Sequence, residues 1–97
     1  MMNFGDAIEC LKLGHKVTRR GWNGRGMFIY LVNGRSVQYE LLKNEAAKAF
    51  ESTKEVNKGR VLKINPHIDM RAADGSIVVG WLASQTDMMA DDWILIR

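Results

Sequence analysis

Hydrophobic positions recur with helical spacing at the start of the chain. From Phe4 to Leu11 the apolar residues fall at i, i+3, i+4 and i+7, which places them on one face of a helix. Asn3 is a residue type that caps helix N-termini, and Gly14 can adopt the left-handed conformation that ends a helix. The pattern therefore predicts a helix over residues 3–13.

Farther along, apolar and polar positions alternate in the manner of β-strands. Branched and aromatic residues fill the predicted strands, and the turn signals GWNG and ADG separate them. Pro66 lacks a backbone N–H and interrupts the alternation that begins at Arg60. The pattern predicts strands at 16–20, 27–32, 76–81 and 93–97, with a loop before the last, and an extended segment over 60–72 that is interrupted or bent at Pro66.

The middle of the chain has a different character. Residues 40–50 favour a second helix by intrinsic propensity, and the polar stretch 51–59 is typical of a mobile connection. We expect an α+β fold: a small, mostly antiparallel sheet of about five strands, an N-terminal helix and a second helix in the middle segment. The length of 97 residues predicts a single domain over 1–97.

Composition excludes some classes of protein and leaves others open. There are 14 Lys and Arg against 11 Asp and Glu, and the sequence pI is near 9.2, so a phosphate-bearing partner is permitted but not required. The basic residues are scattered, whereas a strong duplex binder more often carries a dense basic stripe. Cys10 is the only cysteine and no apolar run is long enough to span a membrane, so we expect a cytoplasmic protein.

The sequence offers no convincing catalytic or metal constellation. His15, His67 and Cys10 lack the spacing of a zinc site, and we expect neither a metal nor a cofactor. Ser84 is not in a nucleophile elbow. Asp91 and Asp92 are neighbours whose side chains should point apart, so a solvated or capping role suits them better than acid–base chemistry. We therefore expect a protein that is not an enzyme.

The three tryptophans are the most distinctive candidates for ligand contacts. Trp22, Trp81 and Trp93 all lie at junctions between loops and strands. Any one of them is more often a packing residue, but an indole face can also stack on a nucleobase. Trp22 sits in a glycine-rich turn, where core packing is least expected. Three arginines are close to it in sequence: Arg19, Arg20 and Arg25.

Two long stretches resemble a known family. "MNFGDAIECLKLGHKVTRRGWNGRGMFIYLV" and "ADGSIVVGWLASQTDMMADDWILI" are similar to the Thoeris anti-defence protein 2 family of phages. The specific feature is the pair of motifs G-W-N-G and W-x-x-S-Q-x-D-x-x-x-x-D-W, in this order and in a short chain. The resemblance covers about the first 32 residues and about 73–96, and residues 33–60 are expected to be a variable insertion.

The resemblance implies a sponge that binds cyclic nucleotide second messengers without altering them. The family's ligands are glycocyclic ADP-ribose isomers and, for some members, cyclic di- or trinucleotides made by bacterial immune systems. Members assemble as oligomers with pockets where subunits meet, so we expect a homo-oligomer, a tetramer built from dimers, acting in the host cytoplasm. The preferred messenger does not follow from the resemblance.

The resemblance also implies which residues bind the ligand. One wall of the pocket would come from the glycine-rich turn and the other from the segment that follows Trp81, where Asp87 could accept hydrogen bonds from ribose hydroxyls or an adenine amino group. Asp91 is expected to cap its loop. Two arginines are candidate phosphate partners by charge. The implied site is Trp22, Asn23, Gly24, Arg20 and Arg25 together with Trp81, Ser84, Gln85 and Asp87.

Three other functions remain open at this stage. A single-stranded nucleic-acid-binding module uses the same stacking and charge, and would bind oligonucleotides with steep salt dependence. A small nucleotide hydrolase would turn the ligand over. A structural or interaction domain would bind no ligand and keep Trp22 packed and inert.

Overall fold

The computed structural model describes all residues from 1 to 97, and the chain falls into two compact units. We call residues Met1–Val32 and His67–Arg97 the sheet unit, and residues Asn33–Pro66 the hairpin unit. The sheet unit contains both stretches that carry the family motifs, and each unit is described below by itself.

The sheet unit begins with helix α1 (Phe4–Lys12), as the hydrophobic spacing predicts. Asn3 caps the helix: its side chain accepts a hydrogen bond from Asp6 N at 2.8 Å, and the Asp6 carboxylate accepts one in return from Asn3 N. Gly14 has φ +90°, the left-handed conformation expected just past the helix. The boundaries are local features, so the sequence alone predicts them.

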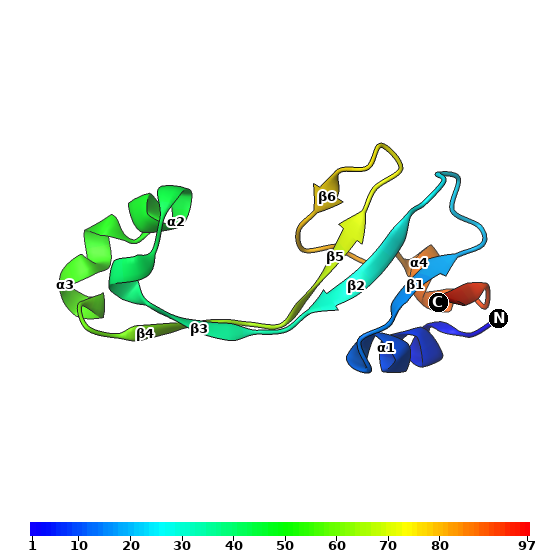
Figure 1. Cartoon of the computed structure of the whole chain (residues 1–97), viewed down its shortest axis with the longest axis horizontal. Coiled ribbons are helices and arrows are strands. Elements are labelled where there is room, and N and C mark those ends of the chain that lie inside the picture. The colour runs from blue at the N-terminus through cyan, green and yellow to red at the C-terminus, as the bar shows by residue number, and fades with distance from the viewer. The chain divides into compact units, whose positions relative to one another are not determined.

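Five antiparallel strands form the sheet, in the order β6-β5-β2-β1-β7 (Figure 1). The expected α+β fold with an N-terminal helix is confirmed. The predicted interruption at Pro66 is also found, because the extended segment divides there into strands that belong to two different sheets. The bounds in this sheet are β1 Lys16–Arg19, β2 Phe28–Val32, β5 His67–Arg71, β6 Ile77–Val78 and β7 Trp93–Ile96.

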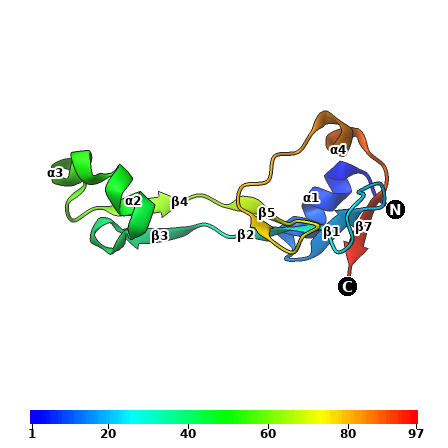
Figure 2. The same ribbon diagram turned by 90° about the horizontal axis from the view of Figure 1, so that it is seen from above.

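The core lies between the sheet and α1. Val17 pairs with Ile29 and with Leu95, and Ile29 pairs with Met70, so these side chains share one side of the sheet. Helices α1 and α4 (Gln85–Met89) lie on the same side (Figure 2). The buried apolar side chains are Ala7, Leu11, Val17, Ile29, Met70 and Trp93.

The C-terminal part of the sheet unit differs from the prediction in two places. The predicted strand 76–81 pairs only as β6, because the chain leaves the ladder at Gly80, which has φ +79° and whose N–H is bonded to Asp69 Oδ1 at 2.9 Å. The predicted loop before the last strand contains α4, which begins after a capping box at Ser84. Both differences come from short side-chain contacts that interrupt or start an element.

The hairpin unit pairs strand β3 (Arg35–Gln38), which was not predicted, with β4 (Val61–Ile64). The predicted helix 40–50 is broken, because Leu42 and Lys43 are extended. Leu42 lines a hollow with apolar residues of both strands, which competes with its helix propensity. The helical segments between the strands are η1 Tyr39–Leu41, α2 Asn44–Ala49, η2 Glu51–Thr53 and α3 Lys54–Asn57.

The stretch 51–59, expected to be a connection, thus contains helical turns. Polar side chains fold it locally: Thr53 Oγ1 donates to Phe50 O at 3.0 Å, and Asn57 Nδ2 donates to Thr53 Oγ1 at 3.0 Å. No side chain in the hairpin unit is buried. Local hydrogen bonds, rather than a core, therefore shape this unit.

Candidate functional site

Arg19 joins the two segments that carry the family motifs. It stands at the end of β1, and its Nη1 donates to Asp87 Oδ1 at 2.8 Å while its Nε donates to Asp92 Oδ1 at 2.8 Å. Asp92 Oδ2 also accepts a hydrogen bond from Gly21 N at 2.8 Å. One guanidinium and two carboxylates thereby fix the glycine-rich loop, residues 20–27, against α4 and the residues that follow it.

Both the carboxylate and the backbone of Asp87 form hydrogen bonds within the chain. It occupies the third position of α4, where its backbone N donates to Ser84 Oγ at 3.0 Å and its Oδ2 accepts from Ser84 N at 3.2 Å. Its Oδ1 accepts from Trp22 Nε1 at 3.0 Å as well as from Arg19. Its backbone oxygen accepts from Trp93 Nε1 at 3.0 Å. Three of about four acceptor positions of this carboxylate are therefore occupied within the fold.

The charges of this network are fixed at neutral pH. Burial of Asp87, which is 9% exposed, would raise the pKa of its carboxyl, but hydrogen bonds from Arg19, Trp22 and Ser84 outweigh burial and lower it. The hydrogen bond from Arg19 is the main reason that the pKa of Asp92 is lowered. The pKa of Arg19 is raised, first by Asp92 and then by Asp87. Carboxylates held in this state are poor general bases, so the network supports structure rather than proton transfer.

An aromatic cluster lies beside the charged network. The ring centroids of Trp22 and Trp93 are 5.3 Å apart and edge-on, and those of Trp22 and Trp81 are 6.2 Å apart. Phe4 of α1 completes the cluster at 5.4 Å from Trp93, which is fully buried. The expectation that the Trp22 ring escapes core packing is wrong, because the loop folds back and partly buries it.

The structure brings together only some of the predicted site residues. Trp22, Trp81 and Asp87 meet in the cluster and network described above, and the exposed Ser84 caps α4. Gly24 lies close to Met27 and Ala73, and a Cβ built on it would clash with the Cβ of Ala73. The loop therefore has no room for a larger side chain at this position.

The remaining predicted residues are exposed. Arg20, which follows β1, lines a hollow of about 410 Å³ with Trp93 and Ile94. The side chains of Asn23, Arg25 and Gln85 are exposed to solvent at the glycine-rich loop and at the first position of α4.

Sequence reasoning missed three residues that organise the site. Arg19 was noted only as one of several arginines near Trp22. The carboxylate that binds the glycine-rich loop is that of Asp92 rather than Asp91. Trp93 is the centre of the aromatic cluster. A signal for part of this existed: S-x-x-D at residues 84–87 is the pattern of a capping box. The partners of Arg19 are 68 and 73 residues away, so no local pattern indicates them.

The arrangement is suited to binding rather than to bond breaking. Indole faces can stack on a flat ring, and the exposed loop residues can hydrogen-bond to its substituents. No group of three or more His, Cys, Asp or Glu residues is placed to hold a metal ion. No helix is both long enough and apolar enough to cross a bilayer.

Comparison with known proteins gives two matches. A family model described as the Thoeris anti-defense 2-like domain matches residues 2–96. The chain is 35% identical over 96 residues to Thoeris anti-defense 2 of Bacillus phage SP01, and the alignment covers 98% of this chain and 94% of that protein. The family model and the alignment both extend across residues 33–60, and the expected variability of this segment stays a prediction.

Proposed function

The chain belongs to the Thoeris anti-defense 2-like family, which supports an anti-defence role, and we propose that it fulfils this role by sequestering a cyclic nucleotide signal. The ligand class is the glycocyclic ADP-ribose type, with cyclic oligonucleotides as further candidates. The protein would act in the cytoplasm of an infected bacterium, where it would hold the signal away from its effector.

The observation that carries this proposal is the rigid pairing of the two motif segments. Arg19 bonds to Asp87 and Asp92 at 2.8 Å, and Trp22 is fixed through its Nε1. A site that is already ordered loses less conformational entropy when it binds a ligand. The partly exposed rings of Trp22 and Trp81 then offer flat surface for the base of a nucleotide, beside the exposed side chains of Asn23 and Arg25.

We propose further that the pocket is completed by a second copy of the chain, in a homo-oligomer that we expect to be a tetramer. The support is an exposed apolar stretch that runs on into α4. Ile77, Val79, Leu82 and Met89 are 63%, 71%, 89% and 81% exposed. Exposed apolar patches are typical of protein interfaces. A mass of one 11.0 kDa chain by light scattering at micromolar concentration would contradict the oligomer.

Sequestration requires that the protein binds the ligand without altering it chemically. Cleavage of a phosphodiester or glycosidic bond usually requires a metal clamp or a positioned acid–base pair. The two carboxylates of the network are engaged by Arg19, and tight binding without preference for a transition state leaves a ligand unreacted.

Calorimetry with a panel of cyclic nucleotides tests binding. To test turnover, the complex is incubated and then denatured by heat, and the released ligand is analysed by chromatography. We expect stoichiometric binding of at least one compound and recovery of the intact ligand. Asn23→Ala and Arg25→Gln should weaken binding without lowering stability, because both side chains are exposed. Lys12→Gln, on the exposed side of α1, is the matched control for loss of one positive charge. Cleaved product in excess over protein would instead identify a hydrolase.

A single-stranded nucleic-acid-binding module is the second candidate. The hairpin unit carries seven basic and four acidic residues, so the whole formal net charge of +3 resides there. Oligonucleotide binding that weakens steeply with salt, together with no affinity for cyclic nucleotides, would favour this function over sequestration.

A further inference from the structure

The side of the sheet that faces away from α1 carries no helix. The buried side chains of Val17 and Ile29 point toward α1, so their neighbours Lys16 and Phe28 point to the other side. The two helices of this unit lie on the first side only (Figure 2). The opposite side of the central strands is therefore available to a ligand.

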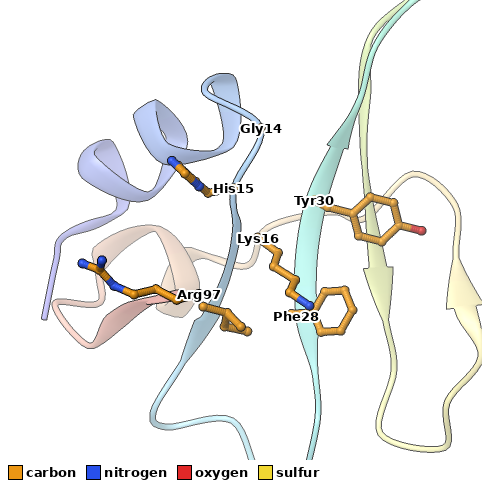
Figure 3. Close-up of a pocket in the computed structure, with 7 residues that line it drawn as sticks. Gly14, His15, Lys16, Phe28, Tyr30 and Arg97 are labelled. Atoms are coloured by element: carbon orange, nitrogen blue, oxygen red, sulfur yellow. The ribbon is translucent and has the colours of Figure 1, made fainter.

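A hollow of about 540 Å³ opens on this side, a volume within the usual range for small-molecule sites. Figure 3 shows Lys16 in the middle, with the two aromatic rings on one side of it and His15 and Arg97 on the other. The residues that line the hollow are Gly14, His15, Lys16, Phe28, Tyr30, Ile96 and Arg97.

Two rings of the hollow form a stacking surface. Phe28 and Tyr30 alternate along β2, the middle strand of the sheet, and their centroids are 6.0 Å apart. Both rings are partly exposed. Aromatic side chains on an open sheet face stack on nucleobases in several single-strand-binding folds.

The other lining residues supply positive charge. Lys16 Nζ lies 4.8 Å from the centroid of the Phe28 ring, where a cation is attracted to the ring face. No residue that lines the hollow carries a side-chain carboxylate. Asp69, which pairs with Tyr30 across the sheet, is only 6% exposed and accepts a hydrogen bond from Gly80 N at 2.9 Å. The charge of the hollow thus complements an anion.

We propose that this hollow is a nucleotide-binding site, separate from the site formed by the glycine-rich loop and α4. The base packs against the rings of Phe28 and Tyr30, whose planes are inclined by 52°, and the phosphate lies toward Lys16, His15 and Arg97. The nucleotide is either free or one unit of a single strand, since both present the same ring and phosphate. This site does not depend on the proposed sequestration function, because it shares no residue with the aromatic cluster of Trp22.

The full chain is titrated with AMP by calorimetry and with a fluorescein-labelled rA8 oligonucleotide by fluorescence anisotropy. The variants are Phe28→Leu, which keeps an apolar side chain, and Lys16→Gln. Lys12→Gln, whose ammonium pairs with Glu9 at 3.3 Å on α1, is the matched control. Asp87→Asn tests whether the two sites are separate.

We expect binding that Phe28→Leu weakens about 5- to 150-fold, the range for loss of one stacked base. Lys16→Gln should reduce the slope of log affinity against log salt for the oligonucleotide by about 1. Lys12→Gln and Asp87→Asn should leave affinity unchanged while the chain is folded. AMP binding identifies a free-nucleotide site, and binding of the oligonucleotide alone identifies a strand site.

Absence of binding to either probe at millimolar concentration would overturn the proposal, as would equal losses in Lys16→Gln and Lys12→Gln. If Phe28→Leu fails to fold, the comparison of Lys16→Gln with Lys12→Gln decides alone, because both side chains are exposed. Loss of AMP binding in folded Asp87→Asn would place the nucleotide at the glycine-rich loop instead, and would also overturn the separate site.

Discussion

Replacing Asp87 by asparagine tests whether the network around Arg19 holds the candidate site together. The change removes a negative charge from a pair whose two side chains are each 12% exposed. An amide also has one oxygen, whereas the carboxylate uses both: Oδ1 accepts from Arg19 and Trp22, and Oδ2 accepts from Ser84 N. At least one donor is therefore left without its acceptor.

The expected loss follows from the partners that remain. Breaking a buried ion pair costs about 3–5 kcal/mol when the remaining charge is left unpaired. Arg19 keeps its bonds to Asp92, so a smaller cost of about 1.5–3 kcal/mol, the range for a hydrogen bond to a charged group, is appropriate. For a domain of this size, a loss of 2 kcal/mol lowers the melting temperature by about 8–16 °C.

The same variant should change how stability depends on pH. The pKa values of Asp87 and Asp92 are lowered in the folded protein, so their contribution is present above their unfolded pKa and is lost as pH falls through the folded pKa. As the pH falls below about 4, the wild type should therefore lose more free energy of unfolding than Asp87→Asn, which retains only the Asp92 part of this dependence.

Urea unfolding followed by tryptophan fluorescence measures both quantities, with Asp91→Asn as the control. Asp91 is an exposed carboxylate in the same segment, so its replacement should change stability by no more than about 0.5 kcal/mol. Equal effects of Asp87→Asn and Asp91→Asn, or an unchanged acid dependence in Asp87→Asn, would refute the structural role of this network.

Four further predictions follow from the contacts. Trp22→Ala should lower the free energy of unfolding in urea by about 3 kcal/mol, the low end for a packed aromatic residue. An unchanged free energy of unfolding in this variant would instead indicate a ring free of packing. Ser84→Ala should cost about 1 kcal/mol in the same assay because α4 loses its cap. Gly24→Ala should lower the melting temperature, by an equivalent of about 1–3 kcal/mol, because its Cβ would lie 2.6 Å from Met27 Sδ. Amide exchange should be faster in residues 51–59 than in β2, because no side chain there is buried; equal protection would contradict this.

The fold was predictable wherever its cause is local. The spacing of apolar residues, the cap at Asn3 and the left-handed Gly14 fix α1, and alternation marks the strands. The path through residues 42–43 and 79–80 was not predictable, because there a tertiary contact such as the bond from Gly80 N to Asp69 competes with local preference. Short elements such as β6 and α4 give too few residues for a periodic pattern.

The candidate site was only partly predictable for a related reason. Motif similarity indicated Trp22 and Asp87 as a pair of ligand contacts, and they do meet, but the structure shows them bonded to each other. Their partner Arg19 joins segments at opposite ends of the chain, which only the folded sheet brings together. A motif therefore marks both the residues that touch a ligand and those that hold the contact residues in place, and sequence alone does not separate the two.

The bonding of Trp22 limits how a ligand could use this residue. Its only polar atom, Nε1, is committed to Asp87, and Trp81 and Trp93 lie edge-on to the ring. A ligand can therefore gain only the stacking surface that remains exposed, and hydrogen bonds to it must come from exposed residues such as Asn23 and Arg25. This arrangement predicts two separate tasks: the buried network would keep the flat surface in place, and the exposed residues of the same loop would select what binds to it. We therefore expect the affinity of a ligand at this candidate site to depend on Arg19 and Asp87, even though both side chains are only 12% exposed.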